Sequence, residues 1–559
     1  MPVRHGGEIV VDALRRHGCE AVFTVPGESF LGILDHLIDT PEIKLITCRH
    51  EAGAAYMAEA YGKLTGKPAV CLVTRGPGAC NASIGLHAAK HDSTPMVLLI
   101  GHVCGYETQR ESFQEIEYRH MFSELSKWVA EIPSADRLPE FVGRAFQLSQ
   151  SGRPGPVVLA MPEDMLDEEI AIADAPVASP VQPEPSPGKM AELRERLARA
   201  ERPFLLVGGG TWSDAAVADI VRFAEANGIP AAIGFRRHDC FDMTSPSYAG
   251  DLGYGTNPRD LPARVDEADL IVATGTRLNT IITQDFTLLQ RLGDGQELVH
   301  VHAESAELGR LFMPALGVQA GIAEFAAAAA ALEPVDWSAR RDWVEAAHAA
   351  YAAILEAPPC EAAFDPGIAM QQLADWLPED AIVTVDAGTY SSWPLRFLRF
   401  KRPMRMLSTN LGSMGSSMPA AVAAGVKYPD RTVICCLGDG SMLQTGQELA
   451  TALQLGSRPI VLVFNNDIYG TIRVNQEARY PGRISATDLT NPDFAALAGA
   501  YGAFGEKVER TGDFLPALER ARASGRAALI ELVLDVEYSS ARATLTEIRE
   551  SGKGPMGRD

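Results

Sequence analysis

The sequence predicts an α/β protein made of three domains, each a doubly wound parallel sheet. One observation is the length, because 559 residues are too many for a single domain and suit about three. A second is that short apolar runs alternate with helical patterns, as they do where crossover helices join parallel strands. The third is the stretch 166–190, whose content of Pro, Ala and Ser is typical of an extended linker.

The first predicted domain covers residues 1–165. It begins with an amphipathic helix rather than a secretion signal, and further helices are expected at 30–37 and 51–64. The apolar runs predict strands at 21–25, 44–48, 69–74, 95–100 and 157–161, the last of which closes the sheet.

The second predicted domain covers residues 190–335 and the third covers 366–538, with a helical connector at 333–365. The second should contain strands at 204–207, 270–274 and 298–302 and a closing helix at 323–332. The third should contain strands at 381–385, 405–409, 432–437, 459–464 and 527–534. The polar tail, 539–559, is expected to be poorly ordered.

The third domain carries the most informative stretch, 435–470. The strand predicted at 432–437 ends in a Gly-Asp-Gly-Ser turn, a helix is expected from 446 to 455, and the strand predicted at 459–464 ends in Asn-Asn. Strand, turn, helix and strand form a right-handed βαβ unit, and ligands of parallel sheets bind at the carboxyl ends of the strands.

Two side chains, Asp439 and Asn466, follow the ends of these two strands, so we expect them to converge on one point. A carboxylate, an amide oxygen and main-chain carbonyls are ligands that Mg²⁺ prefers. Gly440 and Ser441 leave backbone N–H groups open to phosphate oxygens. The stretch therefore predicts a site for a metal ion and a diphosphate, although a tight turn followed by an ordinary loop would give part of the same pattern.

Composition excludes several classes of function. The formal net charge of −22 argues against a nucleic-acid or anionic-membrane surface. No apolar run approaches membrane-spanning length. The nine cysteines form no Cys-x-x-Cys pair and several lie in apolar runs, which is typical of reduced, buried thiols in the cytoplasm.

The spacing within the informative stretch resembles that of a known family. Between Gly440 and Asn465 lie positions 441–464, that is 24 residues, and the Asn-Asn pair then follows. This resembles the thiamine diphosphate motif of the acetolactate synthase and pyruvate decarboxylase superfamily. Further segments are similar to the acetolactate synthase branch, namely 49–54, 74–78, 92–95, 113–115, 153–156 and 480–483.

The resemblance implies a thiamine diphosphate- and Mg²⁺-dependent enzyme that decarboxylates a 2-oxo acid and joins the product to an acceptor. It implies that the first domain binds the pyrimidine ring of the cofactor and that the third binds the diphosphate. The second would be the family's central domain. The metal ligands would be Asp439, Asn466 and the main-chain carbonyl of Ile468, while Met414 would hold the cofactor in a bent shape. The remaining cofactor-binding positions would be Gly388, Thr389, Ser413, Gly438, Gly440, Ser441, Tyr469, Gly470 and Thr471.

In the family that this sequence resembles, a glutamate at the position of Glu51 forms a hydrogen bond with the cofactor's aminopyrimidine ring. This hydrogen bond promotes removal of the thiazolium C2 proton. The family's glutamate comes from the partner subunit, so the resemblance implies at least a homodimer, or a homotetramer. A helix-start carboxylate stabilised by the helix dipole is the alternative interpretation of Glu51.

Glu28 is one of the residues that depart from acetolactate synthases, which have glycine there. We expect a carboxylate at this place to exchange protons with the reaction intermediate or the product, and so to act with Glu51 as a catalytic group. Arg75, His91 and Gln114 are the neighbours expected to tune Glu28, since their segments border the same cleft, and His91 and Gln114 are predicted to take part in catalysis. The alternative is again a helix-start carboxylate.

Other departures leave the substrate and the central domain open. The family's Gln-Trp pair after Asn-Asn is missing, which argues against a biosynthetic acetohydroxyacid role. Arg277 matches an FAD-binding arginine, but the four residues after it differ from the family's Phe-Asp-Asp-Arg, so FAD, an adenine nucleotide and an empty site remain alternatives.

Two other functions therefore stay under consideration. One is a lyase or decarboxylase of the same fold that acts on an acyl-CoA or a diketone. A basic CoA-binding lid would support it, but the tail has only four basic residues, which is weak support: Arg542, Arg549, Lys553 and Arg558. The other is a nucleotide-binding regulatory protein that has lost catalysis.

Overall fold

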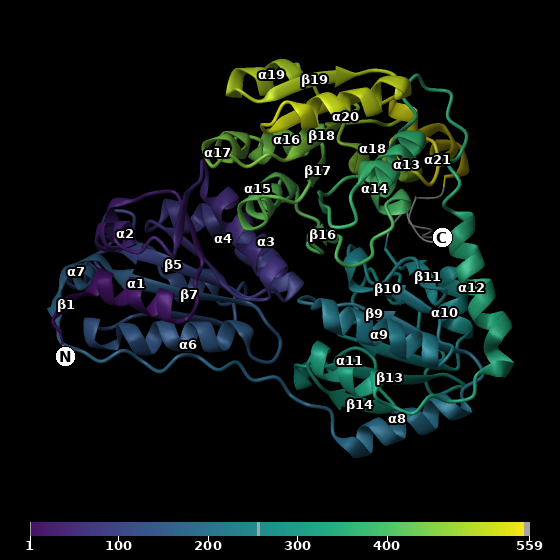
Figure 1. The fold of residues 1–559 in the computed structure, drawn as a ribbon, viewed down its shortest axis with the longest axis horizontal. Helices are drawn as coiled ribbons and strands as arrows, with labels where there is room; N and C mark the ends of the chain where they lie inside the picture. The colour runs from purple at the N-terminus through teal and green to yellow at the C-terminus, as the bar shows by residue number, and fades with distance from the viewer. Residues whose placement is uncertain (1, 254–257, 553–559) are drawn as a thin grey trace. The chain divides into compact units, whose positions relative to one another are not determined.

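The computed structural model describes residues 2–253 and 258–552. It contains three six-stranded sheets whose strand pairs are all parallel, so the predicted α/β class with three parallel-sheet domains is confirmed (Figure 1). The chain forms two compact units. One is built on residues 1–181 and holds the first sheet, while the other holds the second and third sheets.

The first sheet has the strand order β3-β2-β4-β5-β7-β6. Its strands are β2 (Ala21–Thr24), β3 (Lys44–Thr47), β4 (Ala69–Val73), β5 (Met96–His102), β6 (Trp128–Glu131) and β7 (Pro156–Pro162). The prediction that the strand at 157–161 closes the sheet is wrong, because β6 pairs outside β7 and forms the edge. The short β6 is partly exposed and lacks the continuous apolar run by which the other strands were found.

Helices cover both faces of this sheet (Figure 1). The apolar side chains of α1, α2 and α6 pack with alternate strand residues on one face. The other face carries α3 and α4, which approach so closely that a Cβ on Gly85 would lie 2.4 Å from the Cβ of Ala55. The helices of this unit are α1 (Gly6–Arg16), α2 (Leu31–Ile38), α3 (Glu51–Thr65), α4 (Pro77–Asp92), α5 (Tyr118–Phe122), α6 (Leu138–Gln150) and α7 (Glu163–Asp167). A small antiparallel pair, β1 (Arg4–His5) and β8 (Glu169–Ile170), lies beside them.

The second sheet has the order β11-β10-β9-β12-β13-β14. Its strands are β9 (Pro203–Val207), β10 (Ala231–Ile233), β11 (Tyr248–Asp251), β12 (Leu270–Thr274), β13 (Glu297–His302) and β14 (Leu316–Gln319). The sequence predicted β9, β12 and β13 but missed the other three, which have only three or four residues each. The helices are α8 (Pro187–Arg199), α9 (Asp214–Ala226), α10 (Leu261–Glu267), α11 (Ile322–Ala330) and the connector α12 (Arg341–Ala353).

The third sheet has the order β16-β15-β17-β18-β20-β19. Its strands are β15 (Ile382–Val385), β16 (Arg405–Leu407), β17 (Val433–Gly438), β18 (Ile460–Asn465), β19 (Phe504–Val508) and β20 (Ala528–Val533). Only β19, an edge strand, was not predicted. The helices are α13 (Pro366–Trp376), α14 (Ser392–Phe397), α15 (Ser417–Lys427), α16 (Asp439–Thr445), α17 (Glu448–Gln454), α18 (Gly470–Arg479), α19 (Phe494–Tyr501), α20 (Phe514–Ala523) and α21 (Leu545–Ser551).

The expected disorder of the tail is wrong for residues 539–552, and residues 553–559 lie outside the described part of the chain. The final helix α21 begins with a capping box, in which Thr544 and Glu547 each accept a hydrogen bond from the other's backbone N–H. Its apolar residues Leu545 and Ile548 are buried against Val474 and Ala478 of α18. The described residues contain no helix long and apolar enough to cross a membrane.

Candidate functional site

The candidate site lies where β17 and β18 end. These strands are hydrogen-bonded neighbours, with Gly438 opposite Phe464, so the residues that follow them share one edge of the third sheet. The structure differs from the prediction in one respect: the helix after β17 begins directly at Asp439, and 446–447 only separate α16 from α17. Asp439 is therefore at the helix start, where the positive end of the dipole favours an anion.

The carboxylate of Asp439 is buried. One oxygen accepts the Gly440 N–H at 2.8 Å and the other accepts the side-chain amide of Asn491 at 2.9 Å. Burial raises the pKa of Asp439 to about 6, although these hydrogen bonds act in the opposite direction. A buried carboxylate that is costly to ionise is well suited to a cation, because the cation would favour the charged form.

Asn491 is a site residue that the sequence analysis missed. Its Nδ2 lies 2.9 Å from an Asp439 oxygen and 3.0 Å from the side-chain oxygens of both Asn465 and Asp467. One amide nitrogen thus joins three oxygens from the ends of two strands. Asn491 stands just before α19, far from the Asn-Asn pair in sequence, and no local pattern indicates its role.

The chain after β18 turns sharply at Asp467, whose φ is +54°, and the main chain of 467–469 then pairs with that of 487–489. Asn466 donates from its Nδ2 to the hydroxyl of Ser539 at 3.0 Å. Ile468 is buried and pairs with Asp488 in an isolated bridge. The three predicted metal ligands, Asp439, Asn466 and Ile468, therefore follow neighbouring strand ends.

Glycine positions show how closely the predicted cofactor-binding residues approach one another. A Cβ on Gly440 would lie 2.6 Å from the ring of Tyr469 and 3.3 Å from the methyl group of Met414. A Cβ on Gly470 would lie 2.5 Å from the Thr389 hydroxyl. These residues come from four separate segments and are gathered at one edge of the sheet, as a binding site requires.

A second group of predicted residues surrounds Tyr390. A Cβ on Gly388 or Gly438 would lie 2.8 or 3.2 Å from the Tyr390 ring, whose hydroxyl donates to the Cys436 carbonyl at 3.1 Å. Asp386, which the sequence analysis did not select, accepts the Gly415 N–H at 2.9 Å. Burial raises the pKa of Asp386 to about 6.

Asp386 thus shapes the loop that carries Ser413 and Met414. Among the described residues, the buried Ser413 hydroxyl has no hydrogen-bond partner. Ser441 is buried in the first turn of α16, whereas Thr471 is exposed in the first turn of α18. An orphaned hydroxyl beside a glycine-lined edge fits a ligand with phosphate oxygens.

The donor set at this edge fits a hard cation that carries a diphosphate. Residues 2–253 and 258–552 contain no cluster of three His, Cys, Asp or Glu side chains that could hold a metal ion. A cation at this edge would use the Asp439 carboxylate together with amide and main-chain oxygens, which is the ligand type that Mg²⁺ accepts.

The N-terminal unit holds Glu51, the first residue of α3. The His50 ring caps this helix by accepting the Ala52 N–H at 3.1 Å. Glu51 accepts the Asn81 side-chain amide at 2.9 Å, and its other oxygen lies 3.5 Å from the place that a Cβ on Gly78 would take. The half-buried carboxylate is therefore oriented by α4.

Glu28 lies on the same edge of the first sheet and pairs with Arg75 at 2.5 Å. Arg75 is nearly buried and also contacts Glu163 at 3.3 Å, so a single arginine holds two carboxylates. The main chain of Gln114 borders the adjacent turn, because a Cβ on Gly76 would lie 2.3 Å from the Gln114 carbonyl.

His91 does not lie beside Glu28 in this chain, contrary to prediction. It is in the last turn of α4, about 20 Å along the helix from Pro77 at 1.5 Å per residue. Its ring packs against His87, with 5.0 Å between the ring centroids. One long helix, α4, separates His91 from the 76–78 turn.

The glycines of the central domain are explained by packing. A Cβ on Gly208 would lie 2.8 Å from Thr276, and one on Gly209 would lie 2.6 Å from the Gly275 carbonyl, so the ends of β9 and β12 require glycine whether or not a nucleotide binds. Arg277 follows and is half-buried. In the same domain, His238 is fully buried, and burial lowers its pKa to about 3. The prediction of FAD stays a prediction.

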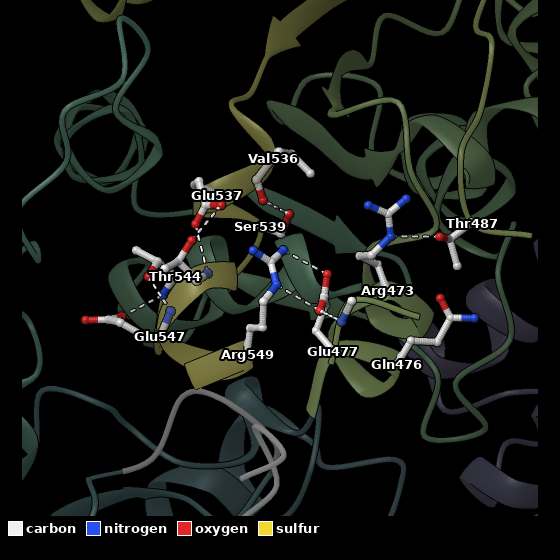
Figure 2. Close-up of polar contacts among 12 residues, drawn as sticks. Arg473, Gln476, Glu477, Thr487, Val536, Glu537, Ser539, Thr544, Glu547 and Arg549 are labelled. Atoms are coloured by element: carbon white, nitrogen blue, oxygen red, sulfur yellow. Dashed lines mark hydrogen bonds and ion pairs between the residues drawn. The ribbon is translucent and has the colours of Figure 1, made fainter. Parts of the chain in front are cut away.

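An ion pair links the C-terminal helix α21 to α18, the helix that begins at Gly470 (Figure 2). Arg549 donates twice to Glu477, with N–O distances of 2.9 and 2.8 Å, and Glu477 also accepts the Gly482 N–H. The Glu477 side chain is fully covered, and the bonds from Arg549 hold its pKa below the ordinary value. Arg549 is thus engaged within the protein rather than available as part of a CoA-binding lid.

We expect Arg549→Met to lower the free energy of unfolding by about 2 kcal/mol, because it leaves the covered Glu477 carboxylate without its counter-ion. The partial exposure of Arg549 keeps the expected loss below that of a fully buried ion pair. Arg522→Met is the matched control, since Arg522 and Glu519 form an exposed pair and should contribute less than about 1 kcal/mol. Thermal melting monitored by circular dichroism measures both. Equal melting temperatures for the two variants would contradict a stabilising role of the Arg549–Glu477 pair.

Three segments of the chain match models of known protein domains. Residues 4–121 match the N-terminal TPP binding domain of thiamine pyrophosphate enzymes, residues 190–329 match the central domain, and residues 386–532 match the C-terminal TPP binding domain. Thiamine pyrophosphate is another name for thiamine diphosphate.

Curated relatives cover nearly the whole chain. The acetolactate synthase isozyme 2 large subunit of Escherichia coli is 32% identical over 538 residues, which are 95% of this chain and 96% of that protein. The acetolactate synthase large subunit of Parasynechococcus marenigrum is 34% identical over 522 residues, 90% of this chain and 83% of that protein. The probable acetolactate synthase large subunit of Methanocaldococcus jannaschii is 30% identical over 555 residues. With three matching domains in the same order, this chain belongs to the thiamine pyrophosphate enzyme family and is related to the acetolactate synthase large subunits.

Proposed function

We propose that the protein is a thiamine diphosphate- and Mg²⁺-dependent enzyme that decarboxylates a 2-oxo acid and joins the remaining acyl unit to a carbonyl acceptor. The observation that carries the proposal is the buried Asp439 carboxylate at the end of β17, on the same edge of the sheet as Asn466 and Ile468, which follow the neighbouring strand β18. The names of the relatives, which are acetolactate synthase large subunits, support the choice of 2-oxo acids.

In this proposal the chain's own residues have separate tasks. Asp439, Asn466 and the Ile468 carbonyl would hold the cation, and Gly440, Tyr469 and the loop at 412–415 would receive the diphosphate. The bound cofactor would supply the electron sink for the decarboxylation. Glu51 would move the proton that activates the cofactor, in the position that Asn81 gives its carboxylate.

The proposal is tested by incubating the purified protein with thiamine diphosphate, Mg²⁺ and a panel of 2-oxo acids, with and without aldehyde or second 2-oxo acid acceptors. We expect release of CO₂ and a ligated product with at least one pair. If no 2-oxo acid releases CO₂ but an acyl-CoA or a diketone is cleaved, the lyase or decarboxylase hypothesis replaces this one. Binding of a nucleotide without turnover of any substrate would favour a regulatory protein.

Several further properties belong to the same proposal. We propose a cytoplasmic enzyme that forms at least a homodimer, since Glu51 would serve a cofactor bound by the partner copy. Analytical sedimentation would measure the oligomeric state.

FAD is proposed as an occupant of the central domain near Arg277. Release of a flavin from the denatured protein tests it.

Glu28 should govern the fate of the product. We expect Glu28→Gly to change the ratio of aldehyde to ligated product while cofactor affinity stays the same, because the variant removes a proton-transfer group that Arg75 holds in place. Chromatographic analysis of the products measures this ratio.

Glu163→Gln is the matched control for that prediction. It alters the other carboxylate on Arg75 but leaves the Glu28 contact, so the product ratio should not change. Wild-type rates and ratios in both Glu28→Gly and Glu28→Gln would reduce Glu28 to a helix-start carboxylate.

A further inference from the structure

The C-terminal segment reaches the cation site through one hydroxyl group, that of Ser539. The residue follows a short helical turn, 536–538, and is buried. Its Oγ lies 2.6 Å from the Val536 carbonyl and 3.0 Å from Nδ2 of Asn466 (Figure 2 shows the contact with Val536). Ser539 therefore touches one of the three proposed cation ligands directly.

The direction of these two hydrogen bonds follows from the number of protons available. A serine hydroxyl has one hydrogen, and the Val536 carbonyl can only accept, so that hydrogen points at Val536. Ser539 then presents only lone pairs to Asn466. The Asn466 amide must turn its NH₂ group toward Ser539, which leaves its Oδ1 as the atom free to face a ligand.

This orientation is the one that a cation needs, because an amide binds Mg²⁺ through oxygen and would repel it through NH₂. We propose that Ser539 is a positioning residue of the cation site, which fixes the Asn466 amide with its oxygen toward the cation. The inference rests on the proposed function, in which Asn466 is a cation ligand. Outer partners of this kind tune metal affinity without touching the metal.

The rest of the segment is built to keep Ser539 in place. The indole N–H of Trp393 donates to the Tyr538 carbonyl at 3.1 Å, and the Ala541 N–H donates to the Ser392 hydroxyl at 2.9 Å. Beyond it, Arg549 fastens α21 to Glu477. Contacts on both sides of Ser539 thus hold its hydroxyl rigidly, as a positioning group requires.

The experiment measures the affinity of Mn²⁺, used as a paramagnetic probe for Mg²⁺, in the presence of saturating thiamine diphosphate. We expect Ser539→Ala to weaken Mn²⁺ binding about tenfold, because the Asn466 amide can then turn either way. Ser539→Thr keeps the hydroxyl and should restore affinity close to that of wild type. Unchanged Mn²⁺ affinity in Ser539→Ala would overturn the inference.

A second background separates orientation from a general structural effect. In Asn466→Asp both side-chain ends are oxygens, so adding Ser539→Ala should change Mn²⁺ affinity by less than about twofold. An equal loss in both backgrounds would also overturn the inference, since it would show that Ser539 acts on folding alone. If the wild type binds no Mn²⁺ in the presence of the cofactor, the proposed function fails. If the wild type binds Mn²⁺ and Ser539→Ala binds it equally well, only the inference about Ser539 fails.

Discussion

Replacing Glu51 by glutamine is expected to lower turnover by about 10²–10⁴-fold while thiamine diphosphate still binds. Glutamine has nearly the same size and keeps an oxygen that can accept the Asn81 amide, so the start of α3 should remain intact. What the variant loses is the ability to take up and return a proton. The exchange of the C2 proton of bound thiamine diphosphate, followed by NMR, should slow by a similar factor.

A surface glutamate of the same domain provides the control. Glu42 is exposed in the loop before β3, and Glu42→Gln should exchange and turn over like the wild type. Wild-type exchange in Glu51→Gln would contradict the assignment of Glu51. A stable monomer with full activity would contradict only the part of the proposal that places Glu51 at a subunit interface.

Asp439→Asn is expected to abolish binding of Mg²⁺ and with it at least about 100-fold of cofactor affinity, because it removes the only anionic ligand of the proposed set. Isothermal titration with Mg²⁺ and thiamine diphosphate measures both. Asp467→Asn is the matched control, since Asp467 contacts the same Asn491 amide but is exposed, and its effect should be much smaller. Cofactor binding by Asp439→Asn at wild-type strength would refute the assignment.

The same variant should stabilise the protein when no metal is present. Burial raises the pKa of Asp439 from 3.8 to about 6, which means that the folded state favours the protonated carboxyl group. The stability that this group contributes is fully present below pH about 4 and is lost as the pH rises through 6. Above pH about 7 the metal-free wild type therefore carries an unfavourable charge worth up to about 3 kcal/mol. Metal-free Asp439→Asn should melt at a higher temperature there, and a lower melting temperature would contradict the cost of burial.

Those parts of the site that follow from one continuous stretch could be predicted from the sequence. Asp439 and Asn466 end neighbouring strands of a βαβ unit, and that unit has a fixed handedness and a fixed ligand edge. Asn491 and Ser539 could not be found in the same way. Both residues lie in turns next to other helices and reach the site only through tertiary contacts, which residue type and spacing in the sequence do not predict.

Errors in the fold have equally local causes. The edge strand β6 and the short strand β10 bury too few residues to form a distinct apolar run. Helix α21 has only two buried apolar residues and is stabilised by its cap and by Arg549, so its sequence looks like a polar tail. His91 lies away from Glu28 because α4 continues for 16 residues from Pro77 and carries His91 in its last turn.

The contact between Ser539 and Asn466 also has a consequence for biosynthesis. Translation proceeds from the N-terminus and domains fold as they emerge from the ribosome, so the first sheet can form long before residues 536–551 are made. Ser539 follows β20 by only a few residues, so in the proposal above the Asn466 amide takes its fixed orientation when the last strand of the third sheet is in place. The divalent ion would therefore be held fully only by a chain whose C-terminal segment has been made, and loading with metal would be one of the last events in maturation.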